Sequence, residues 1–150
     1  MKYVILLFLL PLISLAQSEN EEGDFTDWLT DYEEAISEAK KEDKKLLVYF
    51  TGSDWCGPCK MLKKDLFAKD EFKAFSESYV MLYIDIPRNR DLLSSEQMTH
   101  NTQLLKRLNK KSVFPFFKIL NSKEKELDEY SGYSMNGEIS YHVDFLKKNI

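Results

Sequence analysis

Short runs of apolar residues recur along the chain and have the character of buried β-strands. Residues 46–51 (LLVYFT), 79–86 (YVMLYIDI) and 114–120 (FPFFKIL) are rich in the aromatic and branched side chains that favour strands. Residues 126–130 predict a fourth strand, which follows the third after a tight turn. So short a link predicts that the third and fourth strands are antiparallel.

Apolar residues at helical spacing predict the helices between these strands. A helix should begin near Gly57, with Pro58 in its first turn, where the missing N–H of proline costs nothing. Residues 104–108 and 139–146 predict two later helices. An earlier helix precedes the first strand and has apolar residues at positions i, i+3, i+4 and i+7. The residues of that apolar face are Tyr32, Ala35, Ile36 and Ala39.

The order of these elements is helix, strand, helix, strand, helix, strand, strand, helix. Alternation in the first half implies parallel crossovers, whereas the second half is a hairpin followed by a helix. We therefore expect an α/β domain over residues 25–150, with a central mixed sheet of about four strands flanked by helices. Phe25 and Trp28 are expected to pack the first helix onto the sheet. Asp85, which ends the second strand, is expected to have a structural role with its hydrogen bonds satisfied, and the polar segment 87–96 is one candidate partner.

The amino-terminal residues have the features of an export signal. An apolar run of 13 residues, 4–16, follows Lys2 and contains Pro11. The run is shorter than the roughly 20 residues that a membrane-spanning helix needs. Ser14 and Ala16 are small residues at the spacing that signal peptidase requires.

We therefore expect residues 1–16 to be a signal peptide that is cleaved before Gln17, with an uncleaved membrane anchor as the alternative. Residues 17–24 (QSENEEGD) are expected to form a flexible acidic tail. Cleavage would leave an exported protein in the periplasm or the extracellular space, where thiols stay reduced only if something reduces them.

Composition narrows the classes of function. With 150 residues, 43% hydrophobic and 31% charged, the chain has a globular balance. Its net charge is −4 and it contains no basic block, which argues against a nucleic-acid partner. Two cysteines exclude a scaffold of several disulfides.

The two cysteines, Cys56 and Cys59, lie at the junction of the first strand and the helix that follows it. A helix N-terminus presents unpaired N–H groups and the positive end of the helix dipole, which would stabilise a thiolate on Cys56. Cys59 lies one turn further and is expected to be more buried. This arrangement suits thiol–disulfide exchange, in which Cys56 attacks a substrate disulfide and Cys59 resolves the mixed disulfide.

Other uses of such a cysteine pair have less support. Half of a zinc site is one alternative, but His100 and His142 show no paired-ligand spacing, so we expect no metal. Covalent haem would need a histidine at the position of Lys60. A purely structural disulfide is the other alternative, and closing so small a loop would stabilise the fold little through chain entropy.

The sequence WCGPCK, residues 55–60, resembles the active site of the thioredoxin superfamily. The resemblance covers roughly residues 31–148. The stretches TGSDWCGPCK, LFAKDEF and DIPRN are most similar to secreted thioredoxin-like proteins and to the carboxy-terminal domain of transmembrane thiol reductants of the bacterial envelope. The resemblance implies a thioredoxin-like fold with an extra amino-terminal helix.

The resemblance also implies roles for individual residues. Cys56 corresponds to the nucleophile and Cys59 to the resolving cysteine. Trp55 corresponds to the aromatic residue beside the site, and Gly57 and Pro58 to the pair that tunes the redox potential. The redox-active disulfide would be the only cofactor.

Pro115 corresponds to the cis-proline that faces the disulfide and helps to hold a substrate strand. Phe114, just before it, is bulkier than is usual in the family and would change the substrate groove. The family often has a buried Asp in the strand before the cysteines, as proton acceptor for the resolving thiol. The candidate positions here hold Tyr49 and Phe50.

The sequence therefore predicts an exported protein-disulfide oxidoreductase, with reduction as the favoured direction. Its partners would be proteins with disulfides and a membrane thiol reductant that donates electrons. The alternatives are an oxidase or isomerase of folding proteins, and a non-catalytic thioredoxin-like binding module.

Overall fold

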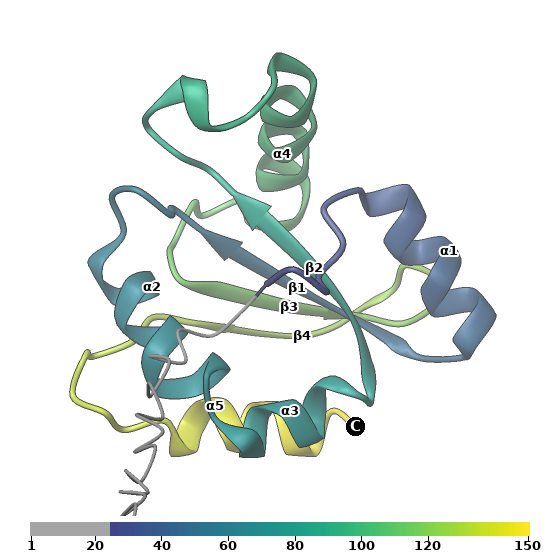
Figure 1. Ribbon diagram of the computed structural model, residues 1–150. Coiled ribbons are helices and arrows are strands. Elements are labelled where there is room, and N and C mark those ends of the chain that lie inside the picture. The colour runs from purple at the N-terminus through teal and green to yellow at the C-terminus, as the bar shows by residue number, and fades with distance from the viewer. Residues whose placement is uncertain (1–24) are drawn as a thin grey trace, which may run out of the picture.

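The computed structural model describes residues 25–150, so the predicted signal peptide and acidic tail lie outside the described residues. A mixed sheet with strand order β2-β1-β3-β4 forms its centre (Figure 1). β1 is parallel to β2 and antiparallel to β3, and β3 is antiparallel to β4, which confirms the predicted fold class and hairpin. The strands are β1 (Lys45–Thr51), β2 (Tyr79–Asp85), β3 (Phe116–Leu120) and β4 (Glu126–Ser131).

Helices cover both faces of this sheet. One face carries α1 and α4, and the opposite face carries α2, α3 and α5 (Figure 1). Within residues 25–150, none of the helices has the length and apolar character that crossing a membrane requires. The helices are α1 (Tyr32–Glu42), α2 (Gly57–Leu62), the π-helix η1 (Lys63–Phe67), α3 (Asp70–Ser76), the 3-10 helix η2 (Arg90–Leu92), α4 (Ser95–Leu108) and α5 (Ser140–Lys148).

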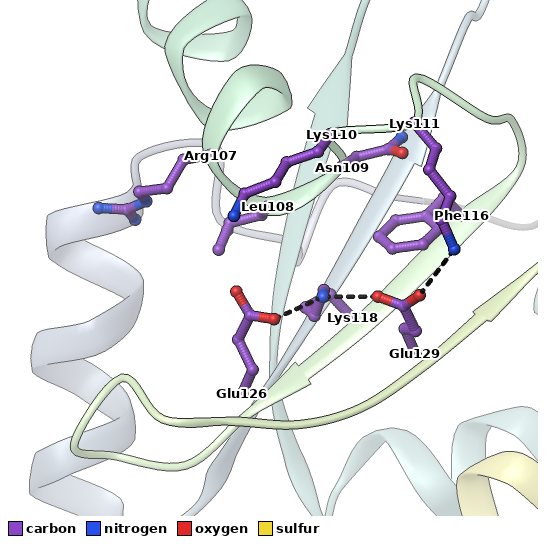
Figure 2. A pocket seen from close by; sticks show the side chains of 9 residues that line it. All are labelled: Arg107, Leu108, Asn109, Lys110, Lys111, Phe116, Lys118, Glu126 and Glu129. Carbon is purple, nitrogen blue, oxygen red and sulfur yellow. Dashed lines mark hydrogen bonds and ion pairs between the residues drawn. The ribbon is translucent and has the colours of Figure 1, made fainter.

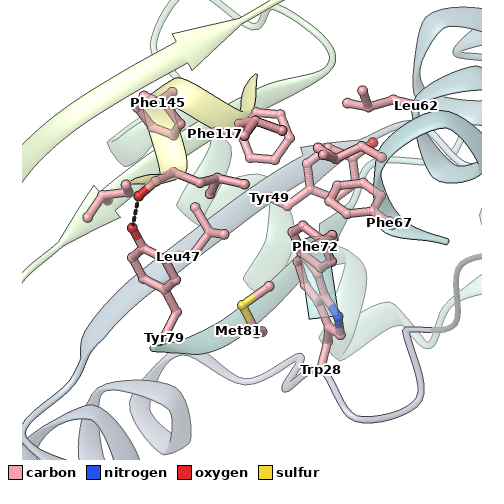
Figure 3. Packing of buried hydrophobic residues seen from close by; sticks show 14 residues of the cluster. Trp28, Leu47, Tyr49, Leu62, Phe67, Phe72, Tyr79, Met81, Phe117 and Phe145 are labelled. Atoms are coloured by element: carbon pink, nitrogen blue, oxygen red, sulfur yellow. Dashed lines mark hydrogen bonds between the residues drawn. The ribbon is translucent and has the colours of Figure 1, made fainter. Parts of the chain in front are cut away.

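Side chains that alternate along β1 divide the core into two clusters. Leu47 and Tyr49 point toward α2, α3 and α5, while Val48 and Phe50 point toward α1 and α4. The first cluster is rich in aromatic rings, and Figure 3 shows several of them packed against one another. The Tyr49 and Phe67 ring centroids, for example, are 4.8 Å apart.

The expected role of Phe25 and Trp28 is wrong. Both rings belong to the aromatic cluster on the α2 face, whereas α1 packs on the other face. The reason lies in Leu29, whose backbone pairs with the edge of β2 in a short parallel bridge. Because side chains alternate along extended backbone, Leu29 points toward α1 and Trp28 points away from it.

The helix that follows the cysteines changes its geometry after about two turns. α2 ends at Leu62 and continues as the π-helix η1. The wider turn lets Leu62, Leu66 and Phe67 all be buried against the sheet. Such π segments are frequent near functional sites.

Candidate active site

Cys56 and Cys59 form a disulfide across the first turn of α2, with an S–S distance of 2.00 Å and a Cα–Cα distance of 5.3 Å. Cys56 is the N-cap residue, and Pro58 lies in the first turn as predicted. The backbone N–H of Cys59 donates to Cys56 Sγ at 3.2 Å. The sulfur of Cys56 therefore sits where helix N–H groups favour a negative charge.

The expected difference in burial between the two cysteines is wrong for this disulfide form. Each residue is 3% exposed. The bond holds Cys56 Sγ over the helical turn and against Cys59, so the first sulfur does not extend into solvent. Any difference in access must therefore arise in the reduced form or in a mixed disulfide.

Trp55 is fixed beside the disulfide by contacts on several sides. Its indole N–H donates to the carbonyl of Ile86 at 2.8 Å. The Arg88 guanidinium lies 4.7 Å from one Trp55 ring centroid, and the Phe114 ring meets Trp55 edge-on at 5.2 Å. Gly52 makes room for the indole, because a Cβ on Gly52 would lie 2.3 Å from Trp55 Cε2.

Two later segments of the chain also reach the site. The Phe114–Pro115 peptide bond is cis, as the resemblance implied, and Phe114 brings this segment against Trp55. The carbonyl of Pro115 accepts the N–H of Gly132 at 2.9 Å, which ties the start of β3 to the loop after β4. Met135 of that loop lies beside the first turn of α2, its Sδ 3.9 Å from the place of a Cβ on Gly57. No spacing in the sequence indicated Gly132 or Met135.

The loop that leads into the cysteine motif is held by a buried carboxylate. Asp85 accepts the backbone N–H of Ser53 at 2.8 Å and also the hydroxyl of Ser53. Asn101 of α4 donates to the Asp85 carbonyl at 2.8 Å. Burial raises the pKa of Asp85, and its bonds to Ser53 act in the opposite direction. The carboxylate of Asp85 therefore has a structural role, as expected, and turns to the loop before the cysteines rather than to segment 87–96.

Asp54 holds the polar segment 87–96 instead. Its carboxylate accepts the backbone N–H groups of Arg88 and Asn89 at 3.0 and 2.9 Å. These bonds lower the pKa of Asp54. The segment that carries Arg88 onto Trp55 is thereby fixed.

A pocket of about 350 Å³ lies beside the second cysteine. Cys59 forms part of its wall, and Tyr49 rather than Phe50 faces it from β1. Thr51, Ser53 and Tyr83 add hydroxyl groups. The other lining residues are Phe25, Lys60, Lys63 and Lys64.

A second pocket, of about 170 Å³, lies on the α4 face and contains no cysteine (Figure 2). The buried ammonium of Lys118 bonds Glu126 and Glu129 at 2.7 Å each. Burial alone would lower the pKa of Lys118, but these carboxylates outweigh it and raise the pKa. Lys118 is thus paired within the pocket, whereas both cysteines lie at the start of α2 on the opposite face. Among residues 25–150 no three His, Cys, Asp or Glu side chains gather as a metal site would need.

Fold and site together define a protein of the thioredoxin type, with a disulfide-forming cysteine pair at the start of a helix. A family model described as Thioredoxin-like matches residues 27–122, and the chain belongs to this family. Over 123 residues it is 32% identical to the thioredoxin-related protein DsbJ of Chlamydia pneumoniae, which covers 81% of this chain and 35% of that protein. Over 111 residues it is 29% identical to the disulfide bond reductase DsbH of the same organism, covering 73% of this chain and 65% of that protein.

Solved structures show the same fold. The DsbH oxidoreductase structure superposes with a TM-score of 0.70 at 25% identity, covering 89% of this chain and 90% of that one. A thioredoxin from Thermus thermophilus superposes with a TM-score of 0.60 at 17% identity, covering 79% and 83%. The chain spans 35% and 65% of the two curated relatives, so their activities as whole proteins do not transfer directly.

Proposed function

We propose that the protein is an exported protein-disulfide oxidoreductase that acts through Cys56 and Cys59, with reduction as its favoured direction. The observation that carries the proposal is the disulfide at the N-terminus of α2, where Cys56 Sγ accepts a helix N–H. A site of this kind lowers the pKa of a thiol and makes the thiolate available for exchange.

In the reduced protein, the Cys56 thiolate attacks one sulfur of a substrate disulfide. The other substrate sulfur leaves as a thiolate and takes a proton, and a mixed disulfide remains on Cys56. The Cys59 thiolate then attacks Cys56 Sγ, and the second substrate sulfur leaves. The substrate has gained two electrons and two protons, and the protein has returned to the disulfide form seen here.

The residues around the disulfide receive their roles from position. Trp55, Gly57 and Pro58 flank or separate the cysteines and would tune the redox potential. Phe114 and Pro115 would hold an extended substrate segment against the disulfide, and the contact of Phe114 on Trp55 supports this role.

The proposed direction of exchange and the proposed location of the protein rest on other features. The Gly57–Pro58 pair resembles that of reducing family members, and one relative is named a disulfide bond reductase. Residues 1–16 would direct export and be removed, leaving the acidic segment 17–24 and the domain 25–150. A reductase outside the cytosol needs electrons, which a membrane thiol reductant would supply.

The experiment uses residues 17–150 and follows insulin reduction by a small dithiol. We expect catalysis by the wild-type protein and none by Cys56→Ser. A protein that binds partners without exchange would leave the rate at the uncatalysed level. A wild-type protein that oxidises reduced substrates but does not speed insulin reduction would favour the oxidase or isomerase alternative.

A further inference from the structure

We propose that Tyr49 is a positioning residue for the resolving thiol. Its hydroxyl, through water held in the pocket beside Cys59, donates a hydrogen bond that favours the Cys59 thiolate. The inference deepens the proposed function, because it concerns the second step of exchange. It also gives a role to the position at which the family often has a buried acid.

The first observation is the direction of the Tyr49 side chain. Tyr49 lies on the α2 face of β1 and is 1% exposed, whereas Phe50 belongs to the cluster on the other face. Phe67 and Phe117 hold the ring, with centroids at 4.8 and 5.0 Å (Figure 3). Rings so placed leave the tyrosine little freedom to turn away from the pocket.

The second observation is that the Tyr49 hydroxyl is buried and makes no hydrogen bond of full geometry among residues 25–150. The Thr51 side chain is its one hydrogen-bonding neighbour, and it acts as a donor that lowers the pKa of Tyr49, so the hydroxyl proton of Tyr49 is left for another acceptor. Buried polar groups in folded proteins nearly always have a partner, either protein or ordered water. Tyr49 lines the pocket of about 350 Å³ together with Cys59, Thr51 and Tyr83. Water occupies about 30 Å³ per molecule in the liquid, so the pocket has room for water that touches the Tyr49 hydroxyl and Cys59. The hydroxyls of Thr51, Ser53 and Tyr83 are further partners for such water.

The third observation is the charge around the pocket. Burial raises the pKa of Tyr49 far above its usual range, so its hydroxyl stays neutral and acts as a donor rather than as a base. Lys60 of α2 and Lys63 and Lys64 of η1 line the pocket and favour a negative sulfur. Opposing them is the buried Asp85 of β2, whose negative charge reaches Tyr49 and Tyr83. Tyr83 is also a neutral donor there, since burial raises its pKa.

These groups act at one point of the reaction. Cys59 loses its proton to water in the pocket, and the resulting thiolate attacks Cys56 Sγ of the mixed disulfide. The Cys56–Cys59 bond forms as the bond from Cys56 to the substrate sulfur breaks, and the released substrate thiolate takes up a proton. A neutral donor near Cys59 favours the charged form before the attack, whereas a hydroxyl-free ring would not.

The test measures the Cys59 thiol alone, in a Cys56→Ser background that has no second sulfur. Thiolate absorbance near 240 nm, titrated against pH, gives the pKa of Cys59 without any need for reagent access. Tyr49→Phe should raise that pKa by about one unit, which lowers the thiolate fraction at neutral pH about tenfold. The matched control is Tyr79→Phe, whose hydroxyl lies in the same cluster but donates to the Leu146 carbonyl at 2.7 Å. The control should leave the titration of Cys59 unchanged.

Circular dichroism and thermal unfolding would establish that each variant is folded. An unchanged Cys59 titration in folded Tyr49→Phe, or an equal shift in Tyr79→Phe, would overturn the inference. The result is separable from the proposed function. If the wild type does not catalyse insulin reduction but Tyr49→Phe still raises the pKa of Cys59, only the proposed function is contradicted. If the wild type catalyses insulin reduction but Tyr49→Phe leaves the pKa of Cys59 unchanged, only the role of Tyr49 is contradicted.

Discussion

The backbone N–H of Cys59 points at the sulfur of Cys56, 3.2 Å away. The backbone of Cys59 therefore supplies part of the electrostatic field that favours a thiolate on Cys56, and the other N–H groups at the start of the helix supply the rest. The two cysteine residues are equally buried while their sulfurs are joined, so the chemical difference between the thiols must come from this field and from their surroundings.

Limited alkylation of the reduced protein near neutral pH should label Cys56 before Cys59. The helix N-terminus favours the Cys56 thiolate, which is the reactive form. Mass spectrometry of peptides after brief iodoacetamide treatment measures the ratio of labels. Labelling of Cys59 first would show that the roles of the two cysteines are reversed.

Cys59→Ser should trap substrates on Cys56 as lasting mixed disulfides, because nothing remains to attack Cys56 Sγ. Non-reducing gels of the variant mixed with a disulfide-bearing protein would show a dithiothreitol-sensitive adduct. Cys56→Ser is the matched control and should form few adducts. Equal amounts of adduct in both variants would contradict the order of attack.

Gly52→Ala should destabilise the protein, because the added Cβ would lie 2.3 Å from Trp55 Cε2. Overpacking of this kind costs about 1–3 kcal/mol in the free energy of unfolding. Urea unfolding followed by tryptophan fluorescence measures the change, and the native spectrum reports displacement of the indole. Gly57→Ala is the control for stability, since its new Cβ would meet only Met135 Sδ at 3.9 Å. A Gly52→Ala protein as stable as the control would argue against the tight contact.

Asp85→Asn should change how stability depends on pH. Burial raises the pKa of Asp85 in the folded protein above its unfolded value. The protonated form is therefore favoured by folding, and the stability that this provides is present at low pH and lost as pH rises through the folded pKa. An amide resembles the protonated acid but does not ionise.

Relative to the wild type, Asp85→Asn should thus be more favourable near pH 7 than near about pH 4. Urea unfolding at both pH values gives the two differences in free energy. A difference that moves the other way would mean that the bonds from Ser53, rather than burial, dominate the pKa of Asp85.

Expression of the full chain with its first residues intact tests export. We expect the mature protein to begin at or within a few residues of Gln17, because the short apolar run and the small residues Ser14 and Ala16 match a signal peptide. Amino-terminal sequencing of the protein from a periplasmic fraction gives the answer. Retention of Met1 in a membrane fraction would support the uncleaved anchor instead.

Much of the fold follows from local pattern. Continuous apolar runs mark the buried strands. Helical spacing marks the buried face of α1, which consists of Tyr32, Ala35, Ile36 and Ala39. The cysteine pair and its helix start could be predicted for the same reason, since all of its parts are adjacent in sequence.

The parts that the sequence did not indicate depend on contacts between distant segments. Trp28 changes face because Leu29 pairs with Leu82, and no local pattern specifies that bridge. Met135 reaches α2 through a loop that Tyr133 anchors by donating its hydroxyl to Asp65 of η1. Contacts of this kind are set by tertiary packing, and they leave no periodic pattern of residues in the sequence from which they could be predicted.

The reduction potential of the Cys56–Cys59 pair tests the central claim most directly. Equilibration of residues 17–150 with defined ratios of reduced and oxidised dithiothreitol or glutathione, with the two redox forms separated after acid quenching and alkylation, measures it. A reductase of this type should give a value near about −270 mV, as for thioredoxin. A value near about −120 mV, as for a strong oxidant, would contradict the direction proposed here.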